Sequence, residues 1–232
     1  SRQALQAAFS YLIMGSIGGS FILIGIGLMY QMTGTLNIND LSQRLPAVMD
    51  TRTIWMAFAF LVVGTSIKLA AFPLHQWLPN AYTYAPSAVS AFLAATATKV
   101  FYYVLVRLIF TVFGVAFVFE RMELHLMLAP LSILAMFIGS IAAIFQKDMK
   151  RLLAYSSIAQ VGYMTLGLSF ANVEGLTGGL VHLFNHALMK GGLFLVVACV
   201  TFRIGSSKIE DLRGLGRQMP FTMAAFIVGG MS

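Results

Sequence analysis

Two lysines, Lys68 and Lys99, lie inside long apolar stretches and have the chemistry needed to carry protons. Between Thr53 and Val106 they are the only charged side chains. A lysine at bilayer depth costs at least about 2.5–3.5 kcal/mol, so it is seldom accidental. Burial without a carboxylate partner disfavours the charged form of a lysine, which suits a group that must gain and lose a proton. We therefore expect both lysines to belong to a proton relay.

Three further titratable residues, His182, His186 and Lys190, recur at positions i, i+4 and i+8. This spacing places them on one face of a helix over roughly 12 Å. Histidine titrates near neutral pH, so the stripe predicts a proton wire. The alternatives are a structural stripe that bonds neighbouring helices and a zinc site. No glutamate follows His182 and no third ligand is evident, so we expect no metal and no other cofactor.

A run of prolines follows Lys68 and predicts a broken helix over residues 68–86. Pro73 lacks an N–H and frees the carbonyl of Leu69, and Pro79 follows closely. A membrane helix broken at depth is tolerated where its freed backbone is buried in protein or faces water. Transporters place ion sites at such breaks. The alternative is a helix that ends at Pro73, with Lys68 reaching to the membrane interface.

Four polar side chains in apolar surroundings could extend a polar path. His75 lies in the proline-broken segment, and Ser156, Ser157 and Gln160 lie within a later apolar run. These groups could line a water path or bond neighbouring helices, and the sequence favours neither.

Composition places the chain among polytopic membrane proteins. Hydrophobic residues make up 59% of the chain and charged residues only 10%, against about 25% charged in soluble domains. Several apolar runs reach the ~20 residues that a membrane-spanning helix needs. We predict one all-α membrane domain over residues 1–232, with about six full spans and part of a seventh near 220. The predicted spans are 11–31, 53–73, 88–113, 125–146, 151–171 and 176–202. The one cysteine, Cys199, is expected to be buried.

The net charge of +7 is explained by topology rather than by nucleic-acid binding. If the spans alternate, eight basic residues fall on one side of the membrane and three on the other. The first side receives Arg2, Lys147, Lys150, Arg151, Arg203, Lys208, Arg213 and Arg217; the second receives Arg44, Arg52 and Arg121. The positive-inside rule predicts that the first side faces the cytoplasm.

With these motifs assembled, the chain resembles the proton-conducting, antiporter-like membrane subunits shared by respiratory complex I and Mrp-type Na⁺/H⁺ antiporters. The resemblance covers essentially the whole chain. It rests on the lysine before the broken segment, the second lysine one helix on, the His-x-x-x-His-x-x-x-Lys stripe and the run KRLLAYSS at 150–157. The segments HQWLPNAYTYAPS and GLGRQMPFTMAAF are most similar to the Mrp D subunit. Complex I subunits usually carry an acidic residue and a histidine where this chain has Asn80 and Tyr82.

The resemblance implies proton translocation within a multi-subunit monovalent cation/proton (Na⁺/H⁺) antiporter, through Lys68, Lys99 and the His–His–Lys stripe. It implies other membrane subunits as partners, H⁺ and Na⁺ or another monovalent cation as cargo, and a bacterial or archaeal plasma membrane. The alternative is a proton-pumping membrane-arm subunit of complex I or a related hydrogenase, whose enzymatic activity would belong to the assembly. A third hypothesis is a structural scaffold. In that family a glutamate partner and a last relay residue lie beyond these residues, so we expect a fragment of a longer fold.

Overall fold

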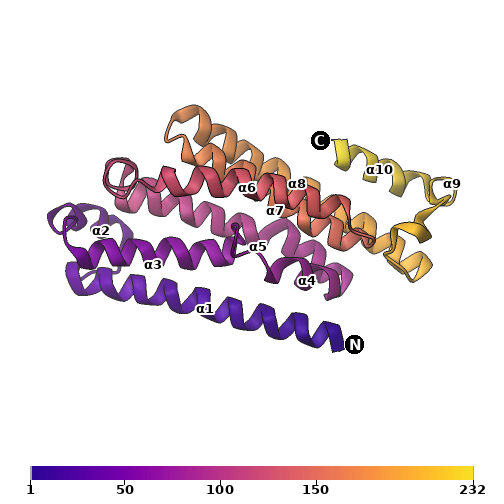
Figure 1. Cartoon of the computed structure of the whole chain (residues 1–232), viewed down its shortest axis with the longest axis horizontal. Coiled ribbons are helices and arrows are strands. Elements are labelled where there is room, and N and C mark those ends of the chain that lie inside the picture. The colour runs from indigo at the N-terminus through magenta and orange to yellow at the C-terminus, as the bar shows by residue number, and fades with distance from the viewer. Residues whose placement is uncertain (1, 232) are drawn as a thin grey trace.

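The chain folds into a bundle of long helices that run side by side along the longest axis of the molecule (Figure 1). The structure is a computed structural model and describes residues 2–231, which are 85% helical and contain no strand. The predicted all-α class is therefore confirmed. The long helices are α1 (Arg2–Thr33), α3 (Arg52–Leu69), α5 (Ser87–Arg107), α6 (Leu124–Ile144), α7 (Met149–Ser169) and α8 (Val173–Ile204).

Shorter helices occupy the connections between the long ones. They are α2 (Ile38–Arg44), η1 (Leu45–Ala47), α4 (Trp77–Tyr84), η2 (Leu108–Phe113), η3 (Ala116–Arg121), η4 (Ile209–Leu212), α9 (Leu215–Gln218) and α10 (Pro220–Met231). Of these, η2 and η3 are π-helical, and η2 extends α5 to Phe113.

Five of the helices within residues 2–231 are long and apolar enough to cross a membrane: α1, α3, α5 with η2, α6 and α8. The remaining predicted span, 151–171, is α7, which has 21 residues like α6 but is more polar. Its polarity is tolerated because α7 packs between α6 and α8. The seventh, α10, has 12 residues. The chain is thus a multi-pass membrane protein, as predicted.

The proline-broken helix is also confirmed. Helix α3 ends at Leu69 because Ala70 adopts the left-handed conformation, with φ of 59°. The Ala70 N–H donates to the Ile67 carbonyl at 3.2 Å, so this end of the helix finds partners inside the protein. Pro73 lies in the segment between α3 and α4. Pro79 lies in the first turn of α4, where the missing N–H costs no intrahelical bond.

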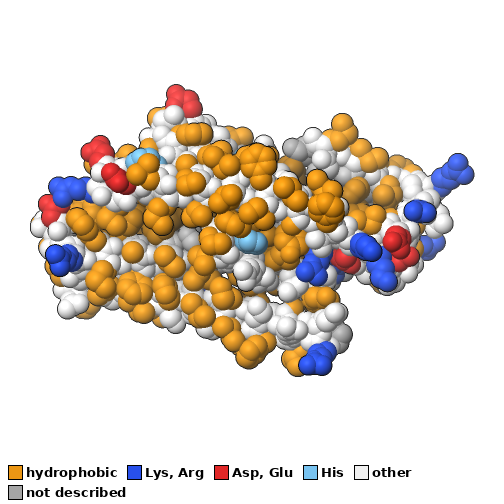
Figure 2. All heavy atoms as spheres, viewed as in Figure 1, with side chains coloured by type: hydrophobic (Ala, Val, Ile, Leu, Met, Phe, Trp, Pro, Cys, Tyr) orange, Lys and Arg blue, Asp and Glu red, His pale blue; other side chains and the backbone are white. Residues whose placement is uncertain are grey.

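Charged side chains gather at the two ends of the bundle, and a broad apolar band separates them (Figure 2). At the end that holds the N-terminus, the α6–α7 connection pairs with the segment after α8. The Met149 N–H donates to the Ser207 carbonyl at 2.8 Å, and the Ile209 N–H donates to the Lys147 carbonyl at 2.9 Å. The Ser207 hydroxyl also donates to the Asp148 carboxylate. These contacts bring together basic residues that the sequence assigns to one side.

The opposite end is organised by two ion pairs. Arg121 pairs with Asp50 across a long sequence separation, and Arg44 pairs with Asp40 at 2.9 Å within α2. A hydrogen bond from Thr35, reinforced by Arg44, lowers the pKa of the Asp40 carboxyl below its usual value. The Arg121–Asp50 pair ties the long connection between α1 and α3 to the end of η3.

One prediction about packing is wrong. Cys199 is exposed on α8 rather than buried. Its neighbours Val197 and Val200 turn inward, and Cys199 lies on the outer face of the same helix. An apolar run in a membrane helix does not say which of its faces meets protein, because lipid is an equally apolar neighbour.

Candidate functional site

The predicted stripe on α8 lies on one face of the helix and is turned toward α5 and α7. His186 and Lys190 are 0% and 2% exposed, and His182 is half-buried. The rings of His182 and His186 stack with their centroids 6.0 Å apart and an angle of 2° between their planes. The stripe sits in the middle of a 32-residue helix, which places it at membrane depth.

Helix α7 supplies hydrogen-bond partners to both ends of this stripe. The Lys190 ammonium donates to the Leu153 carbonyl at 3.2 Å and to the Ser156 hydroxyl at 2.9 Å. His182 Nε2 lies 2.5 Å from the Gln160 amide oxygen. The Ser157 hydroxyl donates to the same Leu153 carbonyl, within its own helix, at 2.9 Å. The structure therefore brings Ser156 and Gln160 to the stripe, whereas Ser157 bonds within α7.

Lys99 joins the same buried region from α5. Its side chain is 6% exposed, and its ammonium donates to the Ala94 carbonyl of its own helix. The two helices touch here, because a Cβ placed on Gly191 would lie 3.3 Å from the Cβ of Ala95. Lys99 interacts electrostatically with Lys190 and with His186. Lys99, His186 and Lys190 are thus three buried titratable groups near one another on α5 and α8.

No carboxylate neutralises these lysines within residues 2–231. The ion pairs found there are Arg44–Asp40 and Arg121–Asp50, both at the far end of the bundle. Two buried ammonium groups without a counter-charge repel each other and lose hydration. Each proton that enters this region therefore disfavours the next.

His186 is the least satisfied member of the cluster. Both of its ring nitrogens are buried, and neither has a hydrogen-bond partner within residues 2–231. A buried polar group of this kind is usually satisfied by ordered water. The position next to Lys99 and Lys190 therefore fits a water-assisted proton transfer.

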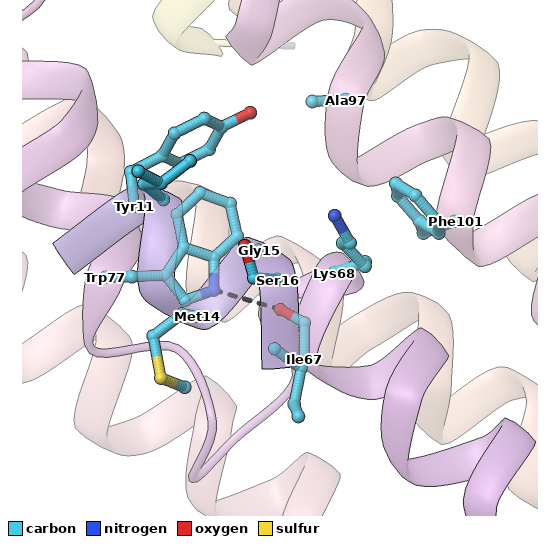
Figure 3. A pocket seen from close by; sticks show the side chains of 10 residues that line it. Tyr11, Met14, Gly15, Ser16, Ile67, Lys68, Trp77, Ala97 and Phe101 are labelled. Carbon is cyan, nitrogen blue, oxygen red and sulfur yellow. Dashed lines mark hydrogen bonds between the residues drawn. The ribbon is translucent and has the colours of Figure 1, made fainter. Parts of the chain in front are cut away.

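Lys68 lies apart from the stripe, beside the helix break. It occupies the last turn of α3, and its ammonium lies 5.8 Å from the centroid of the Phe101 ring. The side chain points into a cavity of about 280 Å³ between α1, α3 and α5 (Figure 3). The cavity walls include Tyr11, Ser16, Trp77 and Ala97. Its volume is large enough for several water molecules, as expected for a lysine next to a broken membrane helix.

His75 lies in the break itself. Its ring is half-buried and stacks on Phe72, with centroids 5.2 Å apart. Its Nδ1 atom has no hydrogen-bond partner in the part of the chain that the structure describes. None of its ring contacts reaches the α8 stripe, so the structure does not join His75 to His182 or His186.

Two further buried residues, on α7 and α5, were not among the predicted site residues. Lys150, counted there only as a boundary charge, is 6% exposed and donates to the Ala85 carbonyl at 3.1 Å. Tyr102, one turn after Lys99, is fully buried, and its hydroxyl donates to the Met164 carbonyl of α7 at 3.0 Å. The spacing of three residues from Lys99 could have pointed to Tyr102 from the sequence. Its hydrogen-bond partner on α7 could not have been predicted in this way.

The buried groups of this region are two lysines and a histidine, each of which can bind a proton. No group of three His, Cys, Asp or Glu side chains lies close enough to hold a metal ion within residues 2–231. His182 and His186 are the nearest approach to a ligand pair, and the groups around them are lysines.

Known proteins share this sequence and fold. The family described as "NADH:quinone oxidoreductase/Mrp antiporter, TM" matches residues 1–232. NADH-quinone oxidoreductase subunit N of Desulforudis audaxviator (strain MP104C) is 45% identical over 100% of this chain and 46% of its own length. An antiporter subunit of Staphylococcus aureus (strain MRSA252), mnhD2, is 34% identical over 98% of this chain and 45% of its own length.

Among solved structures, the Mrp complex from Dietzia sp. DQ12-45-1b contains a chain that superposes with a TM-score of 0.89 at 28% identity. The match covers 98% of this chain and 41% of that one. The chain thus spans about half the length of the relatives it matches. Because the family match extends over all 232 residues, the chain belongs to the NADH:quinone oxidoreductase/Mrp antiporter transmembrane family.

Proposed function

We propose that this chain translocates protons across a membrane as part of a subunit of a multi-subunit monovalent cation/proton antiporter. The observation that carries the proposal is the cluster of Lys99, His186 and Lys190. All three are buried and close together, with no carboxylate among them within residues 2–231. Such a cluster does not stabilise a fold, since buried charges without a counter-charge cost several kcal/mol each. A role in moving protons accounts for its presence.

In this proposal a proton moves along α8 and between α8 and α5 through ordered water. Lys99 and Lys190 each hold a proton in turn, since their mutual repulsion disfavours double occupancy. His186, with both ring nitrogens unpartnered within residues 2–231, accepts a proton at one nitrogen and releases one from the other. Lys68 exchanges protons through the cavity next to the helix break.

The partners follow from the relatives. One relative is named as a subunit of NADH-quinone oxidoreductase and another as an antiporter subunit, so we propose other membrane subunits as neighbours of this chain. The cargo would be H⁺ with Na⁺ or another monovalent cation, and the lipid environment a bacterial or archaeal plasma membrane. The end with eight basic residues would face the cytoplasm.

The second candidate is a membrane-arm subunit of a redox complex of the NADH:quinone oxidoreductase type. The 45% identity to subunit N, higher than the 34% to the antiporter subunit, favours it. The proton path would be the same, and the driving reaction would occur in other subunits. Purification of the full-length protein with its natural partners separates the two: redox subunits identify one assembly, small antiporter subunits the other.

The proposal is tested by measuring proton flux in vesicles that contain the assembled complex. We expect Lys99→Ala and Lys190→Ala each to lower flux about a hundredfold, the scale on which positioned proton-transfer groups act. Lys147→Ala is the matched control, because Lys147 is exposed at the end of the bundle and should leave flux unchanged. Normal flux in both relay variants, with the complex assembled, would refute the proposal.

A further inference from the structure

The residues of α7 that touch the α8 stripe are arranged as a matching polar stripe. Ser156 and Gln160 are four residues apart, so they lie one above the other on one face of α7. The helices run in opposite directions, and Ser156 meets Lys190 at 2.9 Å while Gln160 meets His182 at 2.5 Å. Each end of the α8 stripe therefore has one hydrogen-bonding side chain on α7.

The chemistry of the Gln160 contact defines the protonation pattern of His182. The contacting atom is the amide oxygen Oε1, which accepts hydrogen bonds and does not donate them. With the amide in this orientation, His182 carries its proton on Nε2 and donates it to Oε1. In a neutral imidazole the other nitrogen, Nδ1, is left as the acceptor.

An amide oxygen is a poor proton acceptor, so Gln160 does not take the Nε2 proton onward. His182 consequently exchanges protons through Nδ1 as long as the Gln160 contact persists. Tyr163, also on α7, packs edge-to-face on the same ring with centroids 6.1 Å apart. The ring is thus held in orientation from two positions of one helix, and stacking on His186 fixes its third side.

We propose that Gln160 and Ser156 are positioning residues for the relay: Gln160 holds His182 as the Nε2–H tautomer, and Ser156 holds the Lys190 ammonium against α7. His186 remains the one member of the stripe whose side chain has no hydrogen-bond partner within residues 2–231. This inference rests on the proposed function, yet its central claim about His182 concerns a tautomer and can be measured without any transport.

The first experiment reads the tautomer directly. The full-length protein is labelled with ¹⁵N-histidine, reconstituted in nanodiscs, and the His182 signals are assigned by comparison with His182→Asn. We expect Nε2–H in the wild-type protein and a mixture of tautomers in Gln160→Met, which keeps the length of the side chain and removes the oxygen. Ser157→Ala, whose hydroxyl bonds only within α7, should leave the signals unchanged. Wild-type Nδ1–H, or an unaltered spectrum in Gln160→Met, would overturn the proposal.

The second experiment follows the pH dependence of proton flux in the assembled complex. The groups that face His182 are Tyr163 from α7, Lys99 from α5 and His186 on α8, and none is a carboxylate. In Gln160→Glu a carboxylate opposite the ring stabilises its protonated form, so the flux profile should move to higher pH by about one unit. Ser156→Ala should lower maximal flux without moving the profile. An unchanged pH profile in Gln160→Glu would contradict the proposal that Gln160 positions His182. A normal tautomer result with flux insensitive to Lys99→Ala instead refutes the proposed function alone.

Discussion

The indole nitrogen of Trp77 donates a hydrogen bond to the carbonyl oxygen of Ile67 at 2.9 Å, across the break between α3 and α4. Trp77 is the first residue of α4, and Ile67 lies in the last turn of α3, next to Lys68. One side chain therefore ties the two halves of the broken helix together at the cavity that holds Lys68 (Figure 3). The break is therefore held by a hydrogen bond between α4 and α3.

Replacement of Trp77 by phenylalanine should weaken this connection between α3 and α4 and destabilise the protein. The variant loses a buried hydrogen bond and part of a buried side chain, which together cost about 1–3 kcal/mol. Urea or SDS unfolding of the full-length protein in detergent measures the loss. Trp55→Phe is the matched control: its indole also donates to a backbone carbonyl, of Met49, but the side chain is 38% exposed. Equal losses in the two variants would show that Trp77 has no special role.

Lys150 should contribute to the stability of the fold and not only to the positive charge at one end of the bundle. Its buried ammonium donates to the Ala85 carbonyl at the C-terminal end of α4, so Lys150→Met removes a charged hydrogen bond of about 1.5–3 kcal/mol. The thermal midpoint of the full-length protein should fall accordingly. Lys147→Met, three residues earlier and exposed, removes the same charge from the same end and should change the midpoint little. A larger effect at Lys147 would contradict the assignment.

Gly179 should tolerate no side chain as long as Tyr102 keeps its hydroxyl. A Cβ at Gly179 would collide with the Tyr102 hydroxyl oxygen, so Gly179→Ala should destabilise the protein by about 1–3 kcal/mol. The Tyr102→Phe variant lacks this hydroxyl, so Gly179→Ala should cost less stability in that background. We expect a coupling energy of about 0.5–3 kcal/mol between the two substitutions in a double-mutant cycle.

The control for this cycle is Gly178→Ala. A Cβ at Gly178 meets no atom within 4 Å, and alanine favours the helix over glycine. The variant should therefore be neutral or slightly stabilising. Additive effects of Gly179→Ala and Tyr102→Phe would mean that the two residues do not touch.

The helices themselves could be predicted because a membrane-spanning segment is defined by local composition. The span expected over 125–146 is observed as Leu124–Ile144, and the one over 176–202 as Val173–Ile204. The break near Pro73 was equally local, since a missing N–H and a clashing ring act within one turn. The shared face of His182, His186 and Lys190 follows from helical periodicity alone.

The failures occur where contacts cross between helices. Cys199 was assigned to the interior although it faces outward, and the burial of Lys150 against a neighbouring segment was not foreseen. In both cases the residue type and its neighbours in the sequence are compatible with either position. Periodicity states which residues share a face but not which face meets another helix.

The sequence by itself determined the class of the protein, its spans, its broken helix and the set of titratable residues, because each of these depends on composition and spacing along one segment. Only the tertiary structure decided that Lys99 joins the α8 stripe while Lys68 stands apart beside the break. It alone decided that Ser156 and Gln160 hydrogen-bond to side chains of the stripe whereas the Ser157 hydroxyl bonds within α7. The physical reason is that hydrogen bonds and charge interactions act over a few ångströms, and which groups come that close is set by how the helices pack.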